Sequence, residues 1–237
     1  MPLEVIYEDN NLVAINKPPG LLVHRTKLAK DADQYALQVL RKQLGRYVYP
    51  CHRIDRKTSG VLLFAMDNNT NRLMMEKFSH GQINKKYLAI VRGFTPDQDM
   101  IDYPIKRDIN HLQPALTRFR TIEKREIDLP YDKFPTSRYS LVEIEPVTGR
   151  MHQIRKHFAH IFHPIIGDRP YGCNKQNKLF NERWNMTSMM LHAYSVDFLR
   201  PITDQKIIIS AYPPHEFLRT CETLGFEKIS QYLNFIN

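Results

Sequence analysis

The densest group of ionisable side chains in this sequence lies between residues 52 and 57, where five of the six side chains in the string HRIDRK can carry charge. Asp55 is the one acid in that string, and Arg53, Arg56 and Lys57 flank it. Nearby positive charge favours the carboxylate form of an aspartate, and a carboxylate can act as a nucleophile or a base without a metal. The string therefore predicts an ionised catalytic Asp55 near an anionic substrate, although a solvated polar loop would have the same composition.

A second group of charges lies in residues 149–168, which read GRMHQIRKHFAHIFHPIIGD. Its basic and imidazole side chains are those of Arg150, His152, Arg155, Lys156, His157, His160 and His163. At helical spacing, those that share one face are His152, Arg155, Lys156 and His160, and the apolar face opposite them consists of Ile154, Phe158 and Ile161. This pattern predicts a basic ridge on a helix of residues 151 to about 161. A zinc site is one alternative, but the cluster has no HExxH motif and no acidic ligand between Arg150 and His163. A surface helix with incidental positive charge is the other alternative.

A third candidate is Tyr87, which follows Lys85 and Lys86 and lies on a predicted strand that ends near Arg92. Enzymes that remove a base from a nucleic-acid helix commonly hold it against an aromatic ring. Tyr87 could provide such a ring, or it could be an ordinary half-buried sheet residue. The glycines form neither GxGxxG nor GxxxxGK[ST], so we expect no nucleotide cofactor.

The composition is that of a globular protein with a basic surplus. The 237 residues are 42% hydrophobic and 25% charged, and 34 Lys and Arg against 25 Asp and Glu give a formal net charge of +9. Such a charge favours a nucleic-acid partner. No apolar run is long enough for a signal peptide or a membrane span, so we expect a cytoplasmic protein without membrane contact. The three scattered cysteines predict free thiols.

The elements that must position these residues alternate between strands and short helices. We expect strands over residues 3–7, 12–16, 61–64, 86–91, 116–123, 138–147, 190–199 and 206–212. We expect helices over residues 31–44, from residue 67 or 68 to 78, over 151 to about 161, and from near residue 214. Residues 94–113 read as turn-rich, and residues 124–137 as an exposed connection. The pattern predicts one α+β domain over residues 1–237, built on a mixed, largely antiparallel sheet flanked by helices.

Taken in order, the segments resemble the RluA-type pseudouridine synthases. The motifs that carry the resemblance are NKPPG at 16–20, HRIDRKTSG at 52–60, KKYLAIVRG at 85–93, GRMHQIRKHFAH at 149–160, HPIIGDRPYG at 163–172 and LHA at 191–193. Ile54 stands where this family usually has Leu, a change that conserves volume. Phe162 and His163 precede Pro164 where many members have a glycine.

The resemblance implies the pseudouridine synthase fold with a central active-site cleft. It also implies isomerisation of a uridine in RNA by base flipping, without cofactor or metal. It gives the catalytic role to Asp55, the ring stacked on the target base to Tyr87, and the charged partner of Asp55 to Arg155. A further group is expected to bind or surround the substrate: Arg53 in the space left by the flipped base, Leu191 as an apolar wall, His52 at a phosphate or as loop support, and Lys17, His24, Lys156 and His157 at phosphates.

Within this family, the chain most resembles the TruC subgroup, the tRNA pseudouridine-65 synthases. The features are the short form without an accessory RNA-binding domain before NKPPG, the FHP context at residues 162–164, and the connection at 124–137. We therefore expect a tRNA substrate and a monomeric enzyme. The alternatives are a ribosomal RNA substrate, a non-catalytic RNA-binding module, and a metal-dependent nuclease that uses the histidines.

Overall fold

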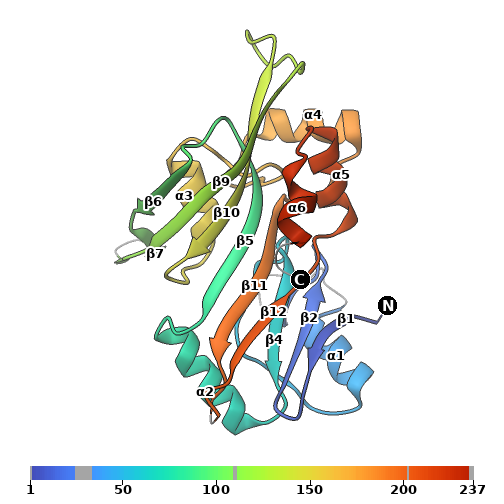
Figure 1. The fold of residues 1–237 in the computed structure, drawn as a ribbon, viewed down its shortest axis with the longest axis vertical. Coiled ribbons are helices and arrows are strands. Elements are labelled where there is room, and N and C mark those ends of the chain that lie inside the picture. The colour runs from blue at the N-terminus through green and yellow to red at the C-terminus, as the bar shows by residue number, and fades with distance from the viewer. Residues whose placement is uncertain (1, 25–33, 109–110, 202, 235–237) are drawn as a thin grey trace. The chain divides into compact units, whose positions relative to one another are not determined.

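The computed structural model describes residues 2–24, 34–108, 111–201 and 203–234. They form two compact units (Figure 1). Unit 1 comprises Met1–Lys85 and Ala193–Pro213, and unit 2 comprises Lys86–His192 and Pro214–Asn237. Each unit has its own strands, helices and apolar core. The expected α+β class is confirmed, whereas the extent of one catalytic domain over residues 1–237 stays a prediction.

Unit 1 is built on a sheet in which β1, β2, β4 and β11 are neighbours in that order, with β3 paired to β4 and β12 to β11. The strands are β1 (Glu4–Glu8), β2 (Leu12–Lys17), β3 (Tyr49–Pro50), β4 (Ser59–Ala65), β11 (Leu191–Leu199) and β12 (Lys206–Ser210). β1 and β2 form the expected antiparallel hairpin. β2 pairs antiparallel with β4, and this register places Lys17 opposite Gly60 at the end of the ladder. The NKPPG segment therefore begins next to the residues that connect the Asp55 loop to β4.

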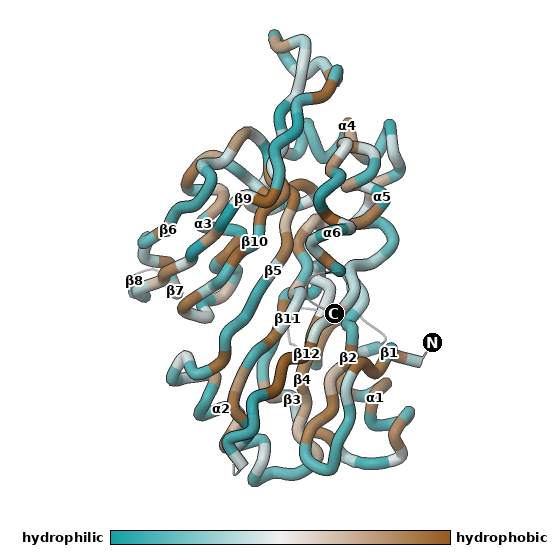
Figure 2. The backbone as a smooth tube through the Cα atoms, in the orientation of Figure 1, coloured by the Kyte–Doolittle hydropathy of each residue, from teal (hydrophilic) through white to brown (hydrophobic). Residues whose placement is uncertain are grey.

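The two faces of this sheet are covered by different apolar clusters. Because side chains alternate along a strand, Leu62 and Phe64 of β4 face the helix α1 (Ala36–Leu44), while Val61 and Leu63 face α2 (Asn68–Ser79). All seven residues of β4 are buried for this reason, and Figure 2 shows the apolar character of β2 and β4. The sheet is therefore rigid at the strand that follows the Asp55 loop.

Unit 2 contains a four-stranded antiparallel sheet in the order β5, β10, β9, β6, and a two-stranded sheet of β7 and β8. The strands are β5 (Asn84–Arg92), β6 (Gln98–Asp102), β7 (Ile105–Asp108), β8 (His111–Gln113), β9 (Leu116–Ile127) and β10 (Ser137–Pro146). The helices are α3 (Gln153–His160), α4 (Asn174–Trp184), α5 (His215–Thr223) and α6 (Lys228–Asn234). β9 and β10 form a long hairpin that projects from this unit (Figure 1).

The helix α3 covers one face of the unit 2 sheet. Its apolar residues Ile154 and Phe158 pack in one cluster with alternate residues of β5 and β10, including Ala89 and Val142. Glu143 points to the opposite face, where it accepts a hydrogen bond from the hydroxyl of Tyr232 on α6. Glu143 also pairs with Arg120 at 2.7 Å. The sheet thus presents an apolar face to α3 and a polar residue to α6.

Several predicted elements are confirmed and others are wrong. Asp67 is the N-cap of α2, with its carboxylate accepting the Thr70 amide, and Gly45 ends α1 in the left-handed region. The first expected helix, over residues 31–44, begins outside the described residues, and α1 itself begins at Ala36. The turn-rich assignment of 94–113 is wrong because it contains β6, β7 and β8, and the exposed connection begins only after β9 ends at Ile127. The sequence pattern does not predict α4 or α6, because both helices bury few apolar side chains. All three cysteines are free, as expected.

Candidate active site

Asp55 lies in the turn that leads into β4 in unit 1. The amide of Thr58 donates to the carbonyl of Asp55 at 3.1 Å, which closes this turn, and Asp55 itself is half-buried. Gly60 allows the strand after the turn to run close to its neighbour: its φ is +109°, and a Cβ there would lie 2.1 Å from the carbonyl oxygen of Ala193. Only glycine can meet both requirements. The geometry fixes the backbone that carries the Asp55 carboxyl.

Lys17 supports the same turn from inside the protein. Its side chain is fully buried, and its Nζ donates to the carbonyl oxygens of Pro18 at 2.9 Å, Leu21 at 2.9 Å and Arg56 at 3.1 Å. Three acceptors satisfy the three donors of an ammonium group. The amide of Gly20 also donates to the Arg56 carbonyl, at 2.7 Å. Lys17 therefore joins the NKPPG turn to the Asp55 loop, and its predicted place on a phosphate-binding surface is wrong.

Burial also shifts the titration of Lys17. Removal from water lowers the pKa of Lys17 to about 7, an effect that the charge of Asp55 opposes. The usual lysine pKa is 10.5, so between about pH 7 and 10.5 the unfolded chain holds a proton that the folded chain has lost. The contribution of Lys17 to the free energy of unfolding must then rise with pH across that window, and it is constant below it.

We expect Lys17→Met to remove this pH dependence and to destabilise the loop, because three carbonyl oxygens lose their donor. The difference in free energy of unfolding between the wild type and Lys17→Met should grow with pH above about 7, with a slope of about 1.4 kcal/mol per pH unit for one proton. Urea unfolding at several pH values measures this difference. The exposed-lysine control is Lys42→Met, and a difference for Lys17→Met that does not grow with pH beyond that of the control would contradict the assignment.

His52, at the start of the charged string, is held by two contacts within unit 1. Its Nε2 accepts the amide of Leu63 at 3.0 Å, and its ring stacks on Phe78 with centroids 4.6 Å apart. Burial, together with the charge of Lys85, lowers the pKa of His52 to about 3, so the ring is neutral. A neutral ring whose Nε2 binds the backbone supports the loop, and it adds no positive charge for a phosphate. The next residue, Arg53, has an exposed side chain, and its substrate contact stays a prediction.

Tyr87 and Leu191 belong to one apolar cluster in unit 2. Tyr87 lies on β5, opposite Ile144 of β10, and packs half-buried against this cluster, whereas Leu191 is buried within it. The cluster also contains Ile154 of α3. The structure therefore places the predicted stacking ring and the predicted apolar wall on the sheet face that α3 covers.

Arg155 of α3 forms a buried ion pair that the sequence pattern does not predict. Its Nε and one terminal nitrogen donate to the two carboxylate oxygens of Asp168, each at 2.8 Å, and both side chains are buried. The ring of Tyr171 lies 5.0 Å from the guanidinium carbon, and the Tyr171 amide donates to Asp168 at 3.3 Å. Asp168 and Tyr171 both belong to the string HPIIGDRPYG, so a signal was present. The pairing of Arg155 with Asp55 stays a prediction.

The basic ridge is only partly confirmed. His152 and Lys156 are half-buried and His160 is exposed, but Arg155 points into the protein. His157 is fully buried and donates from Nε2 to the carbonyl of Tyr103 at 2.9 Å. Its predicted phosphate contact is therefore wrong. His24 is half-buried, and the phosphate contacts of His24 and Lys156 stay predictions.

The histidines of α3 and its exit have separate structural partners. Nδ1 of His152 is hydrogen-bonded to the Tyr171 hydroxyl at 3.0 Å, the His160 ring stacks on Tyr103 at 3.6 Å, and Nδ1 of His163 donates to the Arg92 carbonyl at 2.8 Å. Within the described ranges, no three His, Cys, Asp or Glu side chains are grouped so that they could hold a metal ion. None of the described helices is long and apolar enough to cross a membrane.

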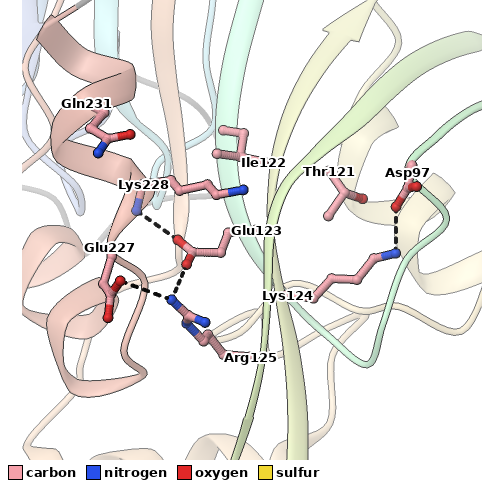
Figure 3. Close-up of a pocket in the computed structure, with 9 residues that line it drawn as sticks. All are labelled: Asp97, Thr121, Ile122, Glu123, Lys124, Arg125, Glu227, Lys228 and Gln231. Carbon is pink, nitrogen blue, oxygen red and sulfur yellow. Dashed lines mark hydrogen bonds and ion pairs between the residues drawn. The ribbon is translucent and has the colours of Figure 1, made fainter.

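The pocket shown in Figure 3 lies elsewhere in unit 2 and contains none of the predicted site residues. Its charged side chains pair with one another: Lys124 with Asp97 at 2.7 Å, and Arg125 with both Glu123 and Glu227. The amide of Lys228 donates to Glu123 at 2.9 Å. The contacts of Glu227 and Lys228 connect β9 to the start of α6, and the pair of Lys124 and Asp97 connects β9 to the residue before β6. These contacts indicate a structural role.

The fold is that of the pseudouridylate synthases. Human RNA Pseudouridylate Synthase Domain Containing 4 superposes with a TM-score of 0.73 and 24% identity, covering 94% of this chain and 93% of that one. Human RNA Pseudouridylate Synthase Domain Containing 1 superposes with a TM-score of 0.75 and 22% identity, covering 99% and 94%. At these identities the likeness establishes the class of fold.

The sequence comparisons establish the family. The RNA pseudouridylate synthase family model matches residues 11–160. The proteins named tRNA pseudouridine synthase C from Haemophilus ducreyi and Pasteurella multocida are 45% and 43% identical, covering 89% and 92% of this chain and 91% and 94% of their own lengths. The protein of that name from Haemophilus influenzae is 39% identical over 96% of this chain and its own full length. This chain belongs to the RNA pseudouridylate synthase family. It is an enzyme that isomerises uridine to pseudouridine, and the predicted family is confirmed.

Proposed function

We propose that this enzyme converts a uridine in tRNA to pseudouridine, at position 65 as the subgroup resemblance implies. The observation that carries this proposal is the similarity, over about nine-tenths of the chain or more, to proteins named tRNA pseudouridine synthase C, at 39–45% identity. The formal net charge of +9 suits a polyanionic substrate. The monomeric state and the cytoplasmic location stay predictions.

The reaction needs one carboxylate and a support for the free base. The bond between N1 of uracil and C1′ of the ribose breaks, the base turns, C5 bonds to C1′, the hydrogen at C5 leaves as a proton, and N1 takes up a proton. We assign the carboxylate role to Asp55, as nucleophile at the sugar or as base. The buried side chain of Lys17 and the turn closed by Thr58 hold its backbone in place. The product is an isomer of the substrate, so the proposed chemistry requires no oxidant, group donor or metal.

Residues of unit 2 would hold the base. The ring of Tyr87 would stack on the extruded uracil, Leu191 would form an apolar wall, and Arg155 would stabilise the charge of Asp55. Their shared sheet face and helix support this assignment. Extrusion of a base costs a few kcal/mol, which stacking and phosphate contacts offset. Arg53 would occupy the space that the base leaves in the RNA.

The release of the C5 hydrogen tests the proposal. The protein is incubated with tRNA and, separately, with ribosomal RNA, each labelled with tritium at C5 of uridine, and the released tritium is counted over many turnovers. We expect release from tRNA and mapping of the product to position 65. Release from ribosomal RNA alone would overturn the tRNA assignment, and binding without release would indicate an RNA-binding module. RNA cleavage that EDTA abolishes would support a nuclease instead.

A further inference from the structure

Phe162 has the most exposed large apolar side chain of the described residues, with 88% of its surface accessible. It follows α3 directly and takes part in the hydrogen bonds that end this helix. The amide of Phe162 donates to the carbonyl of Ala159 at 3.1 Å, and the amide of His163 donates to that of Phe158 at 2.9 Å. These two bonds form the Schellman motif, in which glycine is the preferred residue at the position of Phe162.

The backbone of Phe162 adopts the left-handed conformation that this motif requires, with φ at +62°. A bulky residue is strained there, because its Cβ approaches the carbonyl oxygen. Exposure of a phenyl ring to water is also unfavourable. Glycine would remove both penalties, so folding alone does not explain the phenylalanine. Strain of this kind is typical of functional positions.

His163, the residue after Phe162, contacts the segment that leads to an aromatic and a basic side chain. Nδ1 of His163 donates to the carbonyl of Arg92 at 2.8 Å, and the amide of Gly93 donates to the carbonyl of Arg138 at 2.7 Å. The next residue, Phe94, is 39% exposed, and the guanidinium of Arg138 lies 5.2 Å from its ring centre. We call Phe94, Arg138, Phe162 and His163 the Phe162 surface.

We propose that the Phe162 surface binds the substrate tRNA and that the ring of Phe162 stacks on an unpaired base. This inference rests on the proposed function. It adds a surface that recognises a part of the tRNA other than the uridine that reacts. Aromatic rings next to cations suit single-stranded nucleic acid, because bases stack on the rings while the cations attract phosphates. The Arg138 side chain is 59% exposed although Glu126 pairs with it. A protein partner would call for a contiguous apolar patch instead.

The variant Phe162→Gly provides the test, because it relieves the backbone and should not unfold the protein. We expect a higher melting temperature than that of the wild type. We also expect the KM for tRNA to rise about tenfold with little change in kcat, within the range measured for the loss of one base stack. The salt dependence of tRNA binding should not change, since no phosphate contact is removed. Phe162→Tyr keeps the ring and should keep the KM of the wild type.

Asn185→Gly is the matched control. Asn185 also ends a helix, α4, with a positive φ of 50° and an exposed side chain, so glycine relieves its backbone without removing a ring. Its KM should equal that of the wild type. An unchanged KM for Phe162→Gly in an active enzyme would overturn this inference. The inference would also be overturned if light scattering shows that the wild type is a dimer and Phe162→Gly dissociates this dimer without changing the KM. If the wild type releases no tritium from tRNA, the proposed function fails first, and direct tRNA binding by both proteins still tests the surface.

Discussion

Replacement of Asp55 by Asn is expected to abolish tritium release from uridine-labelled tRNA, with a loss of at least about 10⁴-fold in kcat. The amide has nearly the shape of the carboxyl, so the turn that Thr58 closes should persist. It carries no negative charge, however, and can neither attack the sugar carbon nor accept a proton. The affinity for tRNA should stay within a few-fold of the wild-type value, because the carboxylate serves the chemistry rather than the contact with phosphates. Single-turnover kinetics and a filter-binding titration measure the two effects separately.

The control for this experiment is Asp128→Asn, which makes the same change at an exposed acid in the chain after β9. Its turnover should match that of the wild type. Turnover at the wild-type rate by Asp55→Asn would contradict the catalytic role of Asp55. A loss of tRNA binding as large as the loss of turnover would show that Asp55 acts in docking.

The sequence predicted the strongly patterned elements of the fold and missed the weakly patterned ones. Alternating apolar residues identified β10, and an aspartate followed by a helical pattern identified α2 with Asp67 as its N-cap. α4 buries only Gln176 and Phe180, so its sequence NKQNKLFNERW carries little helical periodicity. β6 is equally weak, because four of its five residues are exposed at the edge of the sheet. Tertiary pairing, rather than local pattern, determines such elements.

The residue types predicted which side chains of the candidate site can carry charge, but they did not predict which of these side chains are buried. Basic residue types such as Lys17 and His157 usually lie at the surface, so the sequence favours phosphate contacts for them. Both are fully buried, and backbone carbonyls satisfy their donors. Those carbonyls belong to residues 1 to 54 positions away in the chain, so composition and helical spacing could not reveal them. Asp168 was missed for the related reason that its partner is 13 residues away.

The second large effect concerns the ion pair of Arg155 and Asp168. We expect Asp168→Asn to lower the free energy of unfolding by about 3 kcal/mol, because it leaves the Arg155 charge buried without its carboxylate. Turnover should fall as well, since the guanidinium loses the bidentate partner that fixes its orientation. Arg155→Lys should also be impaired, because a lysine cannot present two parallel donors to one carboxylate. Urea unfolding and tritium release are the two measurements.

A double-mutant cycle separates this pair from its surroundings. If the two side chains act as one unit, Arg155→Met combined with Asp168→Asn should destabilise by less than the sum of the single changes, because the double variant buries no unpaired charge. The matched control is the exposed helical pair of Arg72 and Glu76, at 2.9 Å, where Glu76→Gln should cost no more than about 0.5 kcal/mol.

Additive effects at Arg155 and Asp168 would show that Arg155 does not depend on this carboxylate. If the changes in free energy of unfolding are non-additive but Asp168→Asn keeps full turnover, the ion pair has a role in folding alone. Loss of turnover in an Asp168→Asn protein that is still folded under the assay conditions would instead assign Asp168 the positioning of Arg155 for catalysis.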